Sequence, residues 1–142
     1  MSFKYFVNRE RLLLRIVLAI SLFMWGFQKI TTPAMDAVYV KDFQSLIFLD
    51  PRLFLIISGV CQIIMALGLI AGIYTRYIAA IYVFMGLMTF VVPGFFTIGN
   101  PYKFTYGLVM AGAGLSLMLT GAGFPSWDSK QIRRERLQEV EE

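Results

Sequence analysis

Five of the polar or charged side chains in or beside the long apolar stretches of this chain are candidates for a functional role: Arg15, Lys29, Gln62, Arg76 and Asp128. Such groups are costly inside a membrane, and where they occur they commonly hold ligands, ions or partner helices. Gln62 is the only strongly polar residue well inside an apolar stretch, about 14 Å from the outer end of its predicted helix. Its amide can clamp neighbouring helices, which is the more common role, or hold a ligand carbonyl.

Lys29 and Arg15 lie near opposite ends of the first apolar stretch. The ammonium of Lys29 can extend to the headgroups, or it can face inward and hold an anion or a quinone oxygen. Arg15, Arg76 and Asp128 are predicted at the other membrane face. There an Arg15–Asp128 ion pair would fasten the first helix to the end of the fourth.

Other chemistry has little support in the residue types. The chain contains no histidine, and Cys61 is its single cysteine, so a dithiol pair and the usual haem and metal ligands are missing. We interpret Cys61 as a small apolar filler, and the methionines as packing residues rather than a copper path. We predict no metal site, no catalytic residues and no covalently bound cofactor, so redox chemistry would need a bound small molecule or a partner subunit.

The elements that must position these residues are four apolar stretches, at residues 12–30, 53–73, 78–96 and 104–124. Hydrophobic residues make up 58% of the chain and charged residues only 15%, against about 25% charged in soluble domains. Each stretch is close to the roughly 20 helical residues that cover about 30 Å of hydrocarbon. The sequence therefore predicts an all-α, polytopic membrane protein with an antiparallel bundle of four transmembrane helices, formed by residues 12–124.

Each predicted helix keeps its small and polar residues on one face, at steps of three and four. The faces are Arg15, Ala19, Leu22, Gly26 and Lys29; Ser58, Gln62, Ala66, Leu69 and Gly72; Ala79, Tyr82, Gly86, Thr89 and Pro93; and Gly107, Ala111, Gly114, Met118 and Gly121. Small residues allow helix backbones to approach closely in a membrane. We therefore expect these faces to point into the bundle.

The remaining segments are a basic lead-in at residues 1–11, a long first loop at 31–52 and a charged tail at 125–142. The loop has apolar residues at helical spacing from Met35 to Ile47, which predicts an amphipathic helix on the outer surface that ends at Asp50-Pro51. Nine of the 13 Lys and Arg residues fall on the side that holds both termini. This bias predicts cytoplasmic termini in a plasma (inner) membrane. It also accounts for the net charge of +4, so we expect no nucleic-acid partner.

Three short motifs resemble the DoxX/DoxD-like family of small four-helix membrane proteins. They are Leu13-Leu14-Arg15 together with Gly26-Phe27-Gln28-Lys29, the passage from Gly68 to Ala80 around Tyr74-Thr75-Arg76-Tyr77, and the segment from Gly121 to Asp128. Their order and spacing span about residues 11–128. Many members of this family place a glutamate where this chain has Gln62, and an amide cannot carry a proton.

The resemblance implies a membrane subunit of a respiratory or redox complex that anchors or docks an oxidoreductase partner and lines a quinone pocket. One alternative is a membrane subunit of a thiosulfate:quinone oxidoreductase with a catalytic role of its own. In that case an outer rim of cations would attract the anion: Lys29, Lys41, Arg52 and Lys103. A second alternative is a membrane assembly factor. The resemblance points to Arg15, Lys29, Arg76 and Asp128 as functional positions. The expected surroundings are the lipid bilayer and membrane or peripheral oxidoreductase subunits, with quinone as the ligand.

Overall fold

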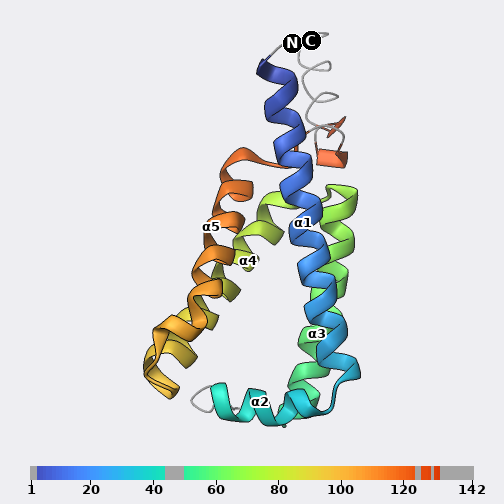
Figure 1. The fold of residues 1–142 in the computed structure, drawn as a ribbon. Coiled ribbons are helices and arrows are strands. Elements are labelled where there is room, and N and C mark those ends of the chain that lie inside the picture. Colours follow the sequence, from blue (N-terminus) through green and yellow to red (C-terminus); the bar gives the residue numbers. More distant parts are fainter. Residues whose placement is uncertain (1–2, 44–49, 124–125, 129, 132–142) are drawn as a thin grey trace.

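The computed structural model describes residues 3–43, 50–123, 126–128 and 130–131, and every regular element in them is a helix (Figure 1). The order is α1 (Phe3–Thr31), α2 (Ala34–Asp42), α3 (Pro51–Ala71), α4 (Thr75–Val91), the π-helical turn η2 (Val92–Thr97), the 3-10 turn η3 (Pro101–Phe104) and α5 (Thr105–Thr120). The all-α class is confirmed. Most of the predicted tail at 125–142, and residues 44–49 of the predicted loop, lie outside the described residues.

Three of these helical segments are long and apolar enough to cross a membrane: Arg9–Thr31, Pro51–Ala71 and Thr75–Thr97. They overlap the predicted spans 12–30, 53–73 and 78–96, and they make the chain a multi-pass membrane protein. The predicted fourth span, 104–124, corresponds to α5, which has only 16 helical residues. That is about 24 Å of helix, short of the roughly 30 Å hydrocarbon core. A bundle of four membrane-crossing helices is therefore not confirmed.

The ends of α3 and α5 follow from local backbone chemistry. The Asp50 carboxylate accepts a hydrogen bond from the Leu53 amide at 3.0 Å and caps the start of α3, so Asp50-Pro51 begins this helix directly. Gly72 ends α3 in a left-handed conformation with φ of 70°, as glycine does at helix C-termini. Gly121, with φ of 74°, ends α5 before the predicted boundary at residue 124.

The four long helices form two antiparallel pairs. α1 packs chiefly on α3, and α4 chiefly on α5. The pairs meet at one end and diverge toward α2 (Figure 1). Arg15, Gly72 and Asp128 lie together where the pairs meet, and we call this the junction end. Helix α2 contacts both α3 and η2, so it bridges the two pairs at the opposite end, which we call the α2 end.

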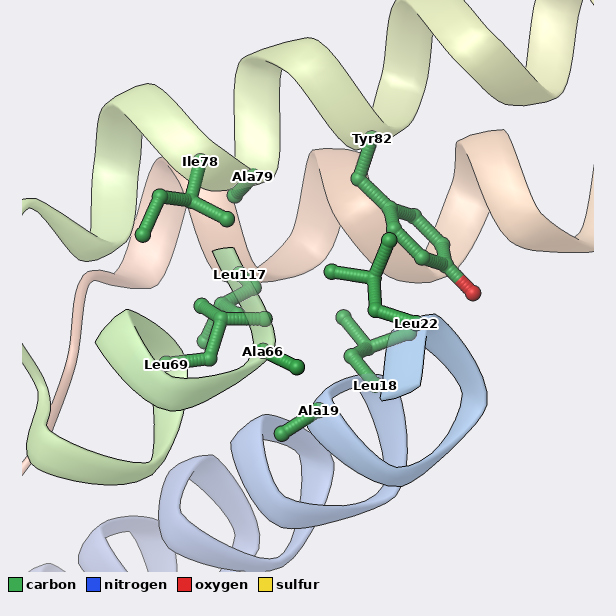
Figure 2. Close-up of a cluster of buried hydrophobic side chains, with 9 residues drawn as sticks. All are labelled: Leu18, Ala19, Leu22, Ala66, Leu69, Ile78, Ala79, Tyr82 and Leu117. Atoms are coloured by element: carbon green, nitrogen blue, oxygen red, sulfur yellow. The ribbon is translucent and has the colours of Figure 1, made fainter. Parts of the chain in front are cut away.

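A buried apolar cluster joins the pairs on the junction side of the molecule. All four long helices contribute to it, through Leu18, Ala19, Leu22, Ala66, Leu69, Ile78, Ala79, Tyr82 and Leu117 (Figure 2). The Tyr82 hydroxyl also forms a 2.6 Å hydrogen bond with the Ser21 hydroxyl, which connects α4 to α1. Toward the α2 end this shared core stops.

Within each pair, two glycines bring the backbones into contact. A Cβ atom added at Gly26 would lie 2.6 Å from the Gly59 carbonyl oxygen, and one added at Gly86 would lie 2.6 Å from the Gly107 carbonyl oxygen. Only glycine fits such approaches, which are typical of close helix pairs in membranes. Gly26, Gly86 and Gly107 belong to the small-residue faces predicted from the sequence, and all three are buried. Gly59 is also buried, but it was not among the residues of the predicted faces.

Candidate ligand site between the helix pairs

A cavity of about 690 Å³ lies between the helix pairs where they diverge. Its wall is largely apolar and rich in rings, from Trp25, Tyr39, Phe43, Phe54, Phe84 and Tyr106. Apolar walls with a few convergent polar groups are typical of small-molecule sites. Exposed residues such as Gln28 and Cys61 also line it, so the cavity reaches the surface.

Gln62 lies at the deep end of this cavity. Its side chain comes from the middle of α3, is 2% exposed and lines the cavity wall. The amide nitrogen lies 4.0 Å from the sulfur of Met85 on α4. The amide oxygen, Oε1, is buried without a hydrogen-bond partner among the described residues, which is rare because an unmade buried hydrogen bond costs about 1–3 kcal/mol. The arrangement leaves an acceptor in an apolar cavity.

The serine and threonine hydroxyls in the wall are already engaged. The Ser58 hydroxyl donates to the Leu55 carbonyl at 3.1 Å, and the Thr89 hydroxyl donates to the Met85 carbonyl at 2.8 Å. Both bonds stay within one helix, as serine and threonine commonly do in helix interiors. Gln62 is therefore the polar group of the deep end that is still able to accept from a ligand.

Lys29 supplies a cation nearer the α2 end. It lies in the last turn of α1 and lines the cavity. A Cβ atom added at Gly26 would lie 3.1 Å from the Gln62 Cβ, so Gln62 is level with Gly26, and Lys29 is about 4.5 Å further along α1. In the part of the chain that the structure describes, no carboxylate forms a salt bridge with this ammonium. The cavity thus has an amide at its deep end and a cation one helical turn away.

Arg52 fixes the α2 end, a role that the sequence analysis did not assign to it. Its guanidinium donates to the Ile30 carbonyl at 2.9 Å and forms a 3.4 Å ion pair with Asp36 on α2. The rings of Tyr39 and Phe54 stack at 5.0 Å between centroids, and burial raises the pKa of Tyr39, which keeps its hydroxyl protonated. Of the four cations predicted to form an outer rim, only Lys29 lines this cavity.

Arg15 and Asp128 meet at the junction end, away from the cavity. The Asp128 carboxylate accepts hydrogen bonds from the Tyr74 and Thr75 amides, each at 3.0 Å, at the start of α4. Arg15, 3% exposed, donates to the Ala122 carbonyl at 3.0 Å and lies near enough to Asp128 for a charge interaction. These contacts join α1, the start of α4 and the segment after α5, which is a structural arrangement.

Arg76 also lies at the junction end and is exposed. Its guanidinium runs beside Gly121, where an added Cβ atom would lie 3.3 Å from Nε. The five predicted residues therefore fall into two groups. Lys29 and Gln62 line the cavity, whereas Arg15, Arg76 and Asp128 surround the junction. The functional role of each stays a prediction.

A comparison with protein-family profiles matches the DoxX profile over residues 11–98. The chain belongs to the DoxX family. The match runs from α1 through η2 and includes Lys29, Gln62 and Arg76, but it stops before α5 and Asp128. Comparisons with curated proteins and with solved structures found no significant match. Membership in the DoxX family, with its membrane-spanning helices, indicates a membrane protein of redox-related function.

Proposed function

We propose that this DoxX protein is a membrane subunit of a redox complex and that its cavity binds a quinone. The observation that carries the proposal is the cavity between the helix pairs, which combines a ring-lined apolar wall with Lys29 and Gln62 as polar groups. A quinone has a flat apolar ring with oxygens on opposite sides. Aromatic side chains pack against such rings, a lysine ammonium is a hydrogen-bond donor for its oxygens, and the unpartnered amide oxygen of Gln62 leaves a polar position for a ligand group at the deep end.

The chain's composition supports an accessory role. With no histidine and one cysteine, it has neither a usual haem ligand nor a dithiol pair. A bound quinone would supply two-electron carrier chemistry, while Lys29, Gln62 and the aromatic wall would hold and orient it. Electrons would come from an oxidoreductase partner that docks on the membrane subunit.

A catalytic subunit of a thiosulfate:quinone oxidoreductase is the alternative. Its predicted outer rim of cations receives less support, because Arg52 is engaged with Asp36 and with the end of α1. A membrane assembly factor would share the docking role but needs no quinone. The alternatives therefore differ from the main proposal in whether a quinone and an oxidoreductase partner should co-purify with the chain.

Extraction of the tagged chain from its native membranes with the surrounding lipid, followed by intact-complex mass spectrometry, tests the proposal. We expect a stoichiometric oxidoreductase subunit together with a quinone mass. Lys29→Met should carry less quinone and keep the partner, whereas Lys103→Met, an exposed lysine outside the cavity wall, should keep both. A chain that carries neither partner nor quinone contradicts the proposal, and a partner without quinone favours the assembly factor.

A further inference from the structure

One contact favours the orientation of the Gln62 amide in the structure. Its nitrogen faces the Met85 sulfur at 4.0 Å, and a thioether sulfur accepts hydrogen bonds but cannot donate them. A rotation that exchanged nitrogen and oxygen would place two acceptors against each other. The amide oxygen is therefore the atom left without a partner among the described residues.

The packing around Gln62 gives this amide little freedom to move. Gly26 and Gly59 bring α1 and α3 into backbone contact at the level of Gln62, whose Cβ would lie 3.1 Å from a Cβ at Gly26. The side chain is thus held away from this close contact and reaches toward α4. Since the Ser58 and Thr89 hydroxyls donate to backbone carbonyls, neither is free to donate to the amide oxygen.

Gln62 Oε1 is an unpartnered acceptor in an apolar cavity, so it favours ligands that have a hydrogen-bond donor over ligands that have none. A ligand hydroxyl satisfies the oxygen, whereas a carbonyl at the same position leaves it unsatisfied and adds a second acceptor. The Lys29 ammonium does not discriminate in this way, because it donates equally to a carbonyl and to a hydroxyl oxygen. The Asp42 carboxylate also lines the cavity and accepts hydrogen bonds, but it lies on α2 at the opposite end. At the deep end, the acceptor that discriminates is therefore Gln62 Oε1.

We infer that the deep end of the cavity binds a ring hydroxyl at Gln62 Oε1, so that the site prefers the reduced, quinol form of its ligand to the quinone form. This inference rests on the proposed function, since it concerns the ligand of the same cavity. The loss of one such hydrogen bond to a buried acceptor corresponds to about a tenfold difference in affinity. A tenfold preference for the reduced form raises the midpoint potential of the bound two-electron couple by about 30 mV.

A redox titration of the purified chain in lipid nanodiscs tests this inference. The probe is a short-chain benzoquinone, and its oxidation state is followed by ultraviolet absorbance. Redox mediators supply the two electrons and the buffer supplies the two protons. We expect the couple bound to the wild-type chain to lie about 30 mV above the same couple in empty nanodiscs. Gln62→Met, which keeps similar side-chain volume but has no strong acceptor, should remove most of this shift. Ser116→Ala, at an exposed position of α5 outside the cavity wall, is the control and should retain it.

A second measurement uses only the wild-type chain and so does not depend on the folding of a variant. We compare the affinities of a short-chain hydroquinone, of the quinone with the same ring, and of the dimethyl ether of the hydroquinone, which lacks hydroxyl donors. The hydroquinone is expected to bind about tenfold more tightly. Equal affinities of the hydroquinone and the quinone, with clear binding of both, would overturn the inference and leave the proposed function intact. Failure of both forms to bind would overturn the proposed function as well.

Discussion

At the residue scale, Asp128 shows how one side chain closes the junction end. Its two carboxylate oxygens accept from the first amides of α4, at Tyr74 and Thr75, and its own amide donates to the Gly72 carbonyl at 3.1 Å. A carboxylate at a helix N-terminus satisfies orphan donors and complements the helix dipole. The sequence predicts Asp128 at the same membrane face as Arg15, and the structure has both at the junction end. A cap supplied from a distant segment leaves no local sequence signature, so the capping role was not predicted.

We expect Asp128→Ala to lower the free energy of unfolding by about 1–3 kcal/mol, because two backbone donors of α4 lose their acceptor. Thermal unfolding in detergent micelles, followed by circular dichroism, measures this loss. Asp36→Ala removes a partly exposed ion pair with Arg52 and should cost less than about 1 kcal/mol. Equal effects of the two substitutions would contradict the capping role.

Gln62 illustrates what residue types alone can predict. Its position in an apolar stretch identified it as the buried polar group, and the structure finds it 2% exposed. The sequence left open whether the amide clamps helices or holds a ligand. That choice depends on whether a donor on another helix reaches the oxygen, and no such donor is found among the described residues.

At the element scale, the small-residue faces were predicted well because helical periodicity determines which residues share a face. Gly26, Gly86, Gly107 and Gly114 are all buried, as expected. The periodicity could not predict which helix each face meets. The glycine contacts join helices within a pair, whereas larger side chains such as Leu22 form the core between the pairs. Because that core lies only on the junction side, the two helix pairs diverge toward α2.

The glycine contacts give a prediction with a matched control. Gly59→Ala should lower the free energy of unfolding by about 1–3 kcal/mol, because its Cβ would lie 2.7 Å from the Gly26 carbonyl oxygen and would push α1 from α3. Gly112→Ala makes the same change on α5 where nothing lies within 4 Å, and it should be neutral or slightly stabilising. Thermal unfolding in micelles compares the two. A neutral Gly59→Ala would show that the pair tolerates separation.

At the scale of the whole molecule, the chain is two helix pairs that share a core at the junction end and are bridged by α2 at the other (Figure 1). The divergence creates a cavity of about 690 Å³. Length and hydropathy predicted the membrane class and the antiparallel order of the helices. They could not predict the cavity, because its volume depends on where contacts between the pairs stop.

The most direct test of quinone binding in this cavity uses Trp25, which lies in its wall. The chain has two tryptophans, so Trp127→Phe leaves Trp25 as the sole tryptophan fluorophore. This variant is titrated with a short-chain benzoquinone, and quenching of the Trp25 fluorescence is measured. We predict saturable quenching that Lys29→Met weakens about fivefold or more, through loss of a charge-assisted hydrogen bond. Lys103→Met, an exposed lysine outside the cavity wall, should leave the affinity unchanged. Quenching that never saturates, or that saturates equally with and without Lys29, would contradict the account.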